Sequence, residues 1–451
     1  MSDTLVWSVT LPLVGALVAT LAPGRGGLVG VVAGLLNLLA SLLVLWQVAF
    51  AGPLEVALGG WQPGLGIALR ADALSALLLV MSALVVLAAS GYATAYFPQR
   101  ADHARFWPLW LLLAAALNGL FLAADVFNVY VALELLGLSA VALTALGHER
   151  AALAAALRYL LVGLIGSMVY LSGVALIYAA CGTLDLATAA HLLEPGLPAW
   201  LAMTLMTTGL LLKTALFPLH FWLPPAHASA PAPVSAALSA LVVKAAVYLI
   251  LRLWLDLFGA VTTTAAANLL GLLGALGVLW GSWQALRAER LKLLAAYSTV
   301  AQVGYLFLFL PILAALPAGP DRDAVFGGAV LLALTPGWAK SALFLAAAVV
   351  QQRAGHDRIR ELDGTAQALP ATTFGIALAG VALVGLPPSG AFLGKWQLIS
   401  GAISVGHWPW VAVVLAGSTL AGGYVFRVLG HAFGQARSPA LCLNVGREEL
   451  S

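Results

Sequence analysis

Apolar stretches, each about as long as a bilayer is thick, follow one another along the whole chain. A membrane-spanning helix needs about 20 predominantly apolar residues, and thirteen stretches of this sequence are long and apolar enough. They begin near Leu5, Leu28, Ala73, Phe106, Val126, Ala152, Trp200, Val234, Ala265, Leu293, Val325, Ala371 and Trp408. Turn-forming pairs such as Pro23-Gly24 and Gly52-Pro53 separate them. The pattern predicts an all-α polytopic membrane protein with about thirteen transmembrane helices.

The segments between the apolar stretches are short. The two longest, around 52–70 and 353–369, have room for a surface hairpin or an interfacial helix but not for a soluble domain. We therefore expect residues 1–451 to form a single transmembrane domain. The first stretch starts at Leu5 without a basic segment before it or a small-residue cleavage pattern after it, so we expect a retained span and not a cleaved signal peptide.

The composition indicates a chain that lies mostly in lipid. Of its 451 residues, 62% are hydrophobic and only 9% are charged, whereas about a quarter of the residues of a typical soluble domain are charged. The two cysteines, Cys181 and Cys442, are too few for a disulfide framework. The composition thus excludes a water-soluble domain of this length and a disulfide framework.

Basic residues alternate between the loops. Counted from the N-terminus, the even-numbered loops carry only Arg70 and Arg322. The odd-numbered loops and the C-terminal tail carry Arg25, Arg100, Arg105, Arg150, Arg287, Arg290, Lys292, Arg353, Arg358, Arg360, Arg437 and Arg447. Because basic loops stay on the cytoplasmic side, we expect a multi-pass protein of the cell inner (plasma) membrane, with the N-terminus outside and the C-terminus in the cytoplasm.

Five ionisable residues lie within the apolar stretches, where each costs roughly 2.5–3.5 kcal/mol on insertion scales. They are Glu134, Lys213, Lys244, Lys340 and Lys395. Ionisable residues inside membranes mark ion pathways and proton relays. The set therefore predicts a protein that moves charge across the membrane.

Glu134 lies about eight residues into the stretch that begins at Val126, with Tyr130 one helical turn before it. One interpretation is a structural ion pair that holds two helices together. The interpretation we favour is a proton relay. Burial disfavours an ionised carboxylate and a nearby cation favours it, so the balance between them lets the group exchange protons. Lys213 is the best candidate for that cation.

Lys213 ends a long apolar run five residues before Pro218. Proline removes a backbone donor and clashes with the carbonyl four residues earlier, so we expect the helix to break between Thr214 and Phe217. Interrupted helices at membrane depth line cavities and ion sites. The alternative is a lysine whose side chain reaches the membrane interface, which would need no helix break.

Two histidines, His220 and His227, follow the predicted break. Histidine changes its protonation state close to neutral pH, so either could transfer protons, or could simply be a polar loop residue. A metal site is the weaker alternative, because no carboxylate or cysteine lies near them in the sequence. We therefore predict no metal ligand here.

Lys395 repeats the arrangement around Lys213, since the prolines Pro387 and Pro388 precede it within a span. The sequence Leu-Pro-Pro occurs near the seventh and twelfth stretches, at 223–225 and 386–388. Units offset by an odd number of spans are inverted relative to each other in the membrane, as in many transporters. We therefore predict two inverted five-helix repeats, over about residues 104–256 and 262–433, with interrupted helices 7 and 12.

Several of these segments resemble the proton-conducting antiporter-like membrane subunits. They are the run from Lys213 to Lys244, the segment 291–305, Glu134 in its helix, and Gly385-Leu-Pro-Pro-Ser-Gly with Lys395. The family contains the three large pumping subunits of respiratory complex I, relatives in membrane-bound hydrogenases, and the A and D subunits of the multisubunit Mrp Na+/H+ antiporters. The resemblance covers about residues 1–435 and favours a protein similar to the D subunit of the Mrp antiporters.

The resemblance implies a role for each buried charge. Glu134 and Lys213 would form the ion pair of the fifth and seventh spans, Lys244 would be the central relay lysine, and Lys395 the terminal residue on the interrupted twelfth span. Lysine at position 395 argues against the complex I subunit that carries glutamate there.

The same resemblance implies that Lys340 matches a further lysine of the eleventh span, and that His220 and His227 match the histidines after the interrupted seventh span. Many relatives have a histidine four or five residues before the lysine of the eleventh span. Here those positions are Pro336 and Thr335, so the sequence leaves the relay role of Lys340 open.

Three functions are consistent with these observations. The first is an ion-translocating, proton-conducting subunit of a multisubunit cation/proton antiporter that uses a buried Glu-Lys-Lys-Lys relay. The alternative is a proton-pumping membrane subunit of a complex I-like NADH:quinone oxidoreductase or membrane-bound hydrogenase. The third is a structural scaffold whose buried charges are only ion pairs.

The expected ligands and partners follow from the same residues. With two cysteines and no nucleotide-binding glycine motif, the chain is expected to carry out no redox catalysis itself and to bind no cofactor and no metal. We expect other membrane subunits and the lipid bilayer as partners, and no nucleic acid. Protons are the expected transported ion, with Na+ or K+ left open as coupling ions.

Overall fold

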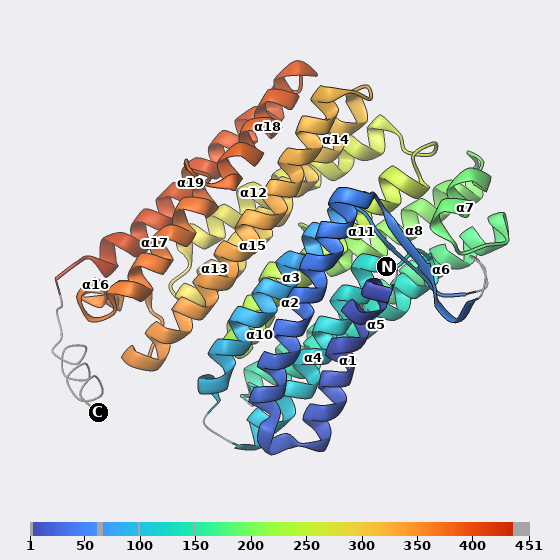
Figure 1. The fold of residues 1–451 in the computed structure, drawn as a ribbon. Coiled ribbons are helices and arrows are strands. Elements are labelled where there is room, and N and C mark those ends of the chain that lie inside the picture. The colour runs from blue at the N-terminus through green and yellow to red at the C-terminus, as the bar shows by residue number, and fades with distance from the viewer. Residues whose placement is uncertain (1–2, 61–65, 98–99, 148, 436–451) are drawn as a thin grey trace. The chain divides into compact units, whose positions relative to one another are not determined.

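The computed structural model describes residues 3–60, 66–97, 100–147 and 149–435. Helices account for nearly all regular structure in these ranges (Figure 1). The α-helices and strands up to residue 262 are α1 (Asp3–Leu21), α2 (Gly26–Ala51), β1 (Leu54–Ala57), β2 (Ala68–Ala71), α3 (Ala73–Tyr96), α4 (Arg100–Leu122), α5 (Val126–Ala145), α6 (Arg150–Cys181), α7 (Leu186–Leu192), α8 (Leu197–Thr214), α9 (Leu223–Ser229), α10 (Ala232–Ala237) and α11 (Val243–Arg252). The α-helices after residue 262 are α12 (Thr264–Arg287), α13 (Leu291–Phe307), α14 (Phe309–Ala315), α15 (Pro320–Ala354), α16 (Thr365–Ala368), α17 (Pro370–Val384), α18 (Gly390–Ser404) and α19 (Trp408–Ala432). Shorter 3₁₀ and π turns join them: η1 (Pro23–Arg25), η2 (Leu58–Gly60), η3 (Leu219–Trp222), η4 (Leu238–Val242), η5 (Leu253–Leu257) and η6 (Ile359–Glu361).

Twelve helical segments of the described chain are long and apolar enough to cross a membrane. The stretch predicted to begin at Ala371 forms two helices of 15 residues each, α17 and α18, because the chain breaks between them. The prediction of an all-α polytopic membrane protein is confirmed. After α15 ends at Ala354, the rest of the segment 353–369 contains only the short helices η6 and α16, as its length predicted.

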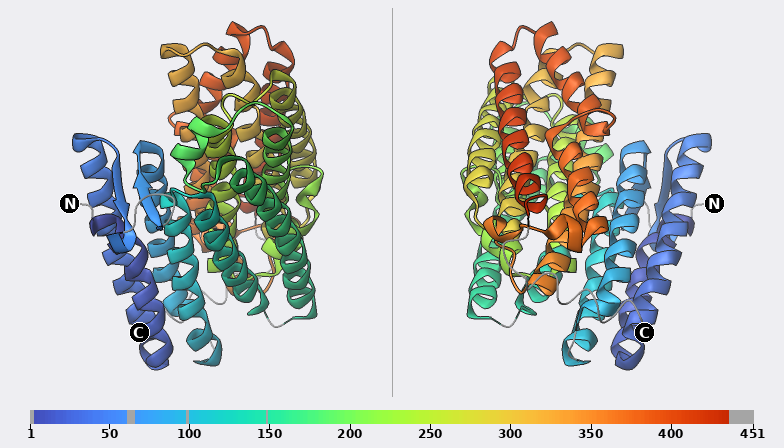
Figure 2. Two further views of the ribbon diagram at one scale, coloured as in Figure 1. Left: turned by 90° about the vertical axis from the view of Figure 1, so that its right-hand side faces the viewer. Right: turned by 90° about the vertical axis from the view of Figure 1, so that its left-hand side faces the viewer.

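The chain divides into two compact units. Unit 1 comprises Met1–Ala215 and Ser229–Thr262, and unit 2 comprises Leu216–Ala228 and Thr263–Ser451. The two side views in Figure 2 show that the helices within each unit run alongside one another. The segment Leu216–Ala228 follows α8 in sequence but packs with the helices of unit 2. Its two histidines therefore belong to unit 2.

Glycines let helices within each unit approach closely. In unit 1, a Cβ atom at Gly209 of α8 would lie 2.4 Å from the carbonyl oxygen of Gly166 of α6. In unit 2, a Cβ atom at Gly304 of α13 would lie 2.4 Å from the carbonyl oxygen of Gly274 of α12. Small residues permit the close packing that stabilises helix pairs in lipid, where the hydrophobic effect does not drive association. The contact between Gly166 and Gly209 positions α8 against α6 one turn before Lys213.

Two helices break where the prolines predicted. Helix α8 ends at Thr214, and Ala215 adopts a left-handed backbone conformation with φ of 54°. Helix α17 ends at Val384 and is followed by Gly385 with φ of 81°. Each break leaves carbonyl groups of the last helical turn without partners inside their own helix. The predicted interruption between Thr214 and Phe217 is confirmed.

The segment 52–70 contributes to a β-hairpin, in which β1 and β2 pair antiparallel. The loop after α4 joins it, since the amide of Ala124 donates to the carbonyl oxygen of Ala68 at 3.1 Å. The loop after α6 joins that loop in turn, since the amide of Val126 donates to the carbonyl oxygen of Leu184 at 3.0 Å. These three loops lie at the same end of the unit 1 helices, which we call the hairpin end.

Candidate functional site

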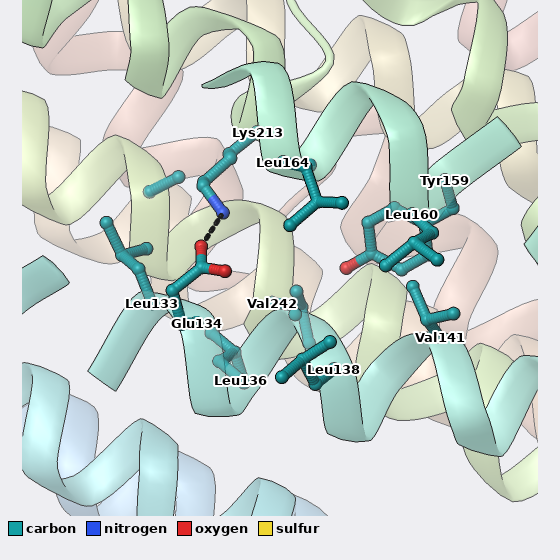
Figure 3. Close-up of a pocket in the computed structure, with 13 residues that line it drawn as sticks. Leu133, Glu134, Leu136, Leu138, Val141, Tyr159, Leu160, Leu164, Lys213 and Val242 are labelled. Carbon is teal, nitrogen blue, oxygen red and sulfur yellow. Dashed lines mark ion pairs between the residues drawn. The ribbon is translucent and has the colours of Figure 1, made fainter. Parts of the chain in front are cut away.

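Glu134 and Lys213 form an ion pair inside unit 1 (Figure 3). Glu134 lies on α5 and Lys213 in the last turn of α8, with Nζ 3.6 Å from Oε1. The same carboxylate oxygen accepts a hydrogen bond from the Ser167 hydroxyl of α6. The Lys213 and Glu134 side chains are 10% and 22% exposed. Three helices thus hold one carboxylate between a charged partner and a neutral one.

A small cavity adjoins this ion pair. Its volume is about 30 Å³, which is enough for one water molecule. Its lining is mainly apolar and includes Leu133, Leu138, Tyr159 and Val242 (Figure 3). Electrostatic interactions are screened weakly in such surroundings. The site therefore has room for one water molecule, and the charge states of Glu134 and Lys213 influence each other strongly.

Lys244 lies on α11, directly after the π-helical turn η4. Turns of this kind are frequent at functional sites. The Lys244 side chain is 5% exposed, and its Nζ has no hydrogen-bond partner among the described residues. Val242 and Ala246, on either side of it in the sequence, line the cavity beside Glu134 and Lys213. A structural ion pair does not account for this buried lysine.

Lys340 is buried in unit 2, on α15. Its Nζ donates to the carbonyl oxygen of Ala295 on α13 at 2.8 Å and also to the hydroxyl of Ser298. His227, which is fully buried, packs its ring against Phe344 with 5.6 Å between the ring centres. Phe344 lies one turn after Lys340. Unit 2 thus brings a histidine from the segment after the first helix break to the helix of this lysine.

Lys395 lies on α18, next to the break that follows α17. Its Nζ donates to the carbonyl oxygen of Val384 at 2.8 Å and to the hydroxyl of Ser418 at 3.0 Å. It also lies 4.5 Å from the ring centre of Tyr305, a cation–π contact. The C-terminal end of a helix carries partial negative charge. The interrupted helix therefore supplies the acceptor that holds the lysine.

His220 is partly buried in η3 of unit 2. Its Nε2 accepts a hydrogen bond from the indole of Trp280 on α12 at 3.1 Å. Its ring stacks on Phe217 with 5.4 Å between the ring centres. Its described contacts are thus with α12 and with its own segment, and not with the buried lysines.

Sequence reasoning did not identify the hydroxyl groups that complete these contacts. Ser167 donates to the carboxylate of the ion pair, while Ser298 and Ser418 accept from two of the lysines. A single serine within an apolar stretch carries no sequence signal, and only the fold shows which serine meets a charge. Within the described ranges, no group of three or more His, Cys, Asp or Glu side chains is arranged to hold a metal ion.

Two interrupted helices, an internal carboxylate–lysine pair and three further buried lysines in a helical membrane bundle define an antiporter-like, ion-translocating membrane subunit. The chain belongs to the family described as NADH:quinone oxidoreductase/Mrp antiporter, TM, whose model matches residues 123–421. The resemblance drawn from the sequence is thereby confirmed.

Two relatives illustrate the range of this family. The chain is 36% identical over 387 residues to NADH-quinone oxidoreductase subunit N of Desulforudis audaxviator, an alignment that covers 84% of this chain and 75% of the relative. It is 27% identical over 403 residues to the D subunit of a Na(+)/H(+) antiporter of Alkalihalophilus pseudofirmus, with 88% and 79% covered.

Solved structures of a respiratory membrane complex and of an Mrp complex contain chains that share the fold. A chain of the membrane-bound sulfane sulfur reductase, an archaeal respiratory membrane complex, matches with a TM-score of 0.86 at 29% identity, covering 98% of this chain and 92% of that one. A chain of the Mrp complex from Dietzia matches with a TM-score of 0.86 at 27% identity, covering 96% and 80%. The fold is therefore that of subunits from multisubunit membrane complexes.

Proposed function

We propose that the chain conducts protons as a subunit of a multisubunit cation/proton antiporter, through a relay of buried charges. The observation that carries this proposal is the Glu134–Lys213 ion pair beside a cavity with room for water. Lys244 is the central carrier, since it lies on the helix that lines the same cavity. In unit 2, Lys340 and Lys395 are the further carriers.

The proposed step begins when the ion pair opens. Moving Glu134 away from Lys213 removes the Coulombic interaction that favours the charged lysine. The ammonium then gives one proton, through water, to the neutral amine of Lys244, and Lys213 is left neutral. When the pair closes again, the carboxylate favours a new proton on Lys213. Each cycle passes one proton from the pair to the central lysine.

His227 and His220 have supporting roles in this proposal. His227 packs against Phe344, one turn from Lys340 on α15, and exchanges protons with that part of unit 2. The histidine that many relatives carry before the lysine of the eleventh span is replaced here by Pro336 or Thr335. His220, oriented by Trp280, lies on the segment that joins the two units in sequence.

A second candidate function is a proton-pumping membrane subunit of a quinone oxidoreductase. The 36% identity to an NADH-quinone oxidoreductase subunit N favours it. In that case the same residues would move protons, but redox reactions in partner subunits would supply the energy. Mass spectrometry of the gently solubilised complex decides between the two candidates. Copurifying flavin or iron–sulfur proteins would identify the redox complex, and small membrane subunits without them would identify the antiporter.

The relay itself is tested in the assembled complex by replacing Glu134 or Lys213 with Ala. We expect proton transport in membrane vesicles to be abolished in both variants, because neither can form the pair. Glu149→Ala is the matched control, since Glu149 is an exposed carboxylate in the loop before α6. Full transport by either pair variant, in complexes that assemble normally, would overturn the proposal.

A further inference from the structure

Four polar residues follow one another at intervals of four along the last part of one span of unit 1. They are Lys244, Tyr248, Arg252 and Asp256, in the helical segment Ala232–Leu257. Residues four apart on a helix are neighbours on one face, and each step advances about 6 Å along the axis. The series therefore leads from a buried lysine in the middle of the span to the end of that span.

Arg252 is held at four points in this series. Its Nε donates to the Tyr248 hydroxyl oxygen at 3.0 Å, and one terminal nitrogen donates to Asp256 Oδ2 at 3.0 Å. The other terminal nitrogen forms an ion pair with Asp72, which precedes α3. The guanidinium also lies over the Tyr248 ring, with 5.4 Å from Cζ to the ring centre. These contacts fix a cation whose side chain is only 17% exposed.

A cavity of about 380 Å³ with charged residues in its lining lies at the hairpin end of unit 1, and Arg252 is one of those residues. Its lining includes Asp72, Asp185, His191, Tyr248, Arg252 and Asp256. One water molecule takes up about 30 Å³ in the liquid, so several waters fit. Water can therefore reach Arg252 and Tyr248 from the hairpin end. Lys244 is the next polar residue of the series.

Tyr248, which lines the cavity and lies one helical turn from Lys244, is not oriented to pass protons towards that lysine. A hydroxyl passes a proton on only if it accepts from one neighbour and donates to the next along the route. The Tyr248 oxygen accepts from Arg252, which also lines the cavity, and the Tyr248 hydroxyl donates to the backbone carbonyl of Phe121 at 2.9 Å. A peptide carbonyl has no proton to release, so the chain of donors stops there.

The positive charge of Arg252 also hinders proton transfer from the cavity to Lys244. Guanidinium remains protonated throughout the physiological range and cannot act as a proton carrier. A fixed positive charge repels hydronium and other cations, as it does in membrane pores that exclude protons. Asp256 follows Arg252 in the series and Asp72 precedes α3, and both carboxylates hold the cation in place.

We infer that Arg252, oriented by Tyr248, is an electrostatic plug that stops protons in the hairpin-end cavity from reaching Lys244. This inference rests on the proposed function, in which Lys244 carries protons. A direct connection between this cavity and Lys244 would let protons bypass the rest of the relay and dissipate the gradient. Arg252 is therefore a positioning and barrier residue and not a proton carrier.

The inference is tested by measuring passive proton leak in vesicles that contain the whole complex without its energy source. A pH difference is imposed and its decay is followed with a pH-sensitive dye. We expect Arg252→Gln to speed the decay several-fold, and the double variant Arg252→Gln/Lys244→Ala to return it to the wild-type rate. Arg252→Met is a second neutral variant in case the first does not assemble, and native electrophoresis checks assembly of each.

Two control variants separate charge from structure. Asp72→Asn breaks the ion pair but keeps the Arg252 cation and an N-cap side chain for α3, so we expect no added leak. Arg70→Gln removes a positive charge that lines the same cavity but lies outside the series, and we also expect no added leak.

Wild-type leak in both neutral Arg252 variants would overturn the inference, and so would a leak that persists without Lys244 or an equal leak from Asp72→Asn. The proposed function is judged separately, by energised transport in the Lys244→Ala variant. If Lys244→Ala loses energised transport while Arg252→Gln leaks no faster than the wild type, the relay is retained and the plug is rejected. Intact transport in Lys244→Ala would instead reject the relay through Lys244.

Discussion

The buried cations of this chain differ in what surrounds them. Lys213 meets a carboxylate, whereas Lys340 and Lys395 meet a helix carbonyl and a serine hydroxyl. Lys244 has no hydrogen-bond partner among the described residues. A carboxylate partner stabilises the charged form far more than neutral acceptors do. The charge of Lys213 is therefore controlled by a carboxylate, a group that can itself change its charge, which fits the start of a relay.

Ser167 allows the ion pair to be perturbed without removing a charge. Its hydroxyl donates to Glu134, so Ser167→Ala removes one hydrogen bond that orients the carboxylate. We expect proton transport to fall several-fold while the complex still assembles. Ser172→Ala is the matched control, because the Ser172 hydroxyl, on the same helix, donates to the Met168 carbonyl of its own helix and is exposed. An unchanged transport rate in Ser167→Ala would show that this hydrogen bond does not position the pair.

Asp72 gives a pH dependence whose sign can be worked out. Burial by itself raises the pKa of Asp72, but the Arg252 charge and hydrogen bonds from Ser75 outweigh it and hold the pKa below its usual value. A carboxylate with a depressed pKa stabilises the folded state above its unfolded pKa, and this contribution is lost as the pH falls through the folded pKa. Asp256, Asp185 and His191 face the same cavity. The ion pair should therefore persist throughout the neutral range.

The measurement is the melting temperature of the solubilised protein relative to its Asp72→Asn variant. We expect the difference to stay constant from about pH 8 to pH 5 and to shrink only in stronger acid, below the ordinary pKa of aspartate. His191 is replaced by Gln in both proteins, so that its protonation does not contribute. A difference that disappears near neutral pH would contradict the assignment of a depressed pKa.

Two helix breaks organise the elements around the site. At each break the chain takes up a left-handed backbone conformation, through Ala215 after α8 and through Gly385 after α17. The first break is followed by a segment that packs in unit 2. The second gives Lys395 its carbonyl acceptor. The inverted repeats over 104–256 and 262–433 remain a prediction.

The two breaks respond oppositely to exchange of Ala and Gly. A left-handed conformation costs a non-glycine residue roughly 1–2 kcal/mol, so Ala215→Gly should preserve or raise stability. Gly385→Ala adds that cost, and its new Cβ atom would lie 2.8 Å from Lys395 Cδ. We therefore expect lower stability and impaired transport. Thermal melting and vesicle transport of both variants check this pair, and a well-tolerated Gly385→Ala would argue against a tight fit of Lys395.

At the scale of the whole molecule, the orientation in the membrane remains a prediction from the basic residues. It places the loop after α6 outside and the loop before α6 in the cytoplasm. We expect a cysteine at Thr183 to react with an impermeant maleimide in intact cells, and one at Ala151 to react only after permeabilisation. Both are introduced after Cys181 and Cys442 are replaced by Ser. The reverse labelling pattern would invert the proposed topology.

The sequence alone determined the membrane class, nearly every span, the family, and the positions of the two helix breaks. It could do so because apolar length, proline and intramembrane charge act locally along the chain. Even the pairing of Glu134 with Lys213 was predicted, because a nearby cation stabilises a buried carboxylate and Lys213 was the best candidate for that cation.

Only the tertiary structure decided which neutral groups meet the charges. Ser167, Ser298 and Ser418 are single serines in apolar helices, and helix packing alone selects them over other serines. The contact of Asp72 with Arg252 joins residues far apart in the sequence. The spacing of Tyr248 and Arg252 after Lys244 is visible in the sequence, but the direction of their hydrogen bonds is not. That direction depends on the carbonyl of Phe121, which the fold places beside them.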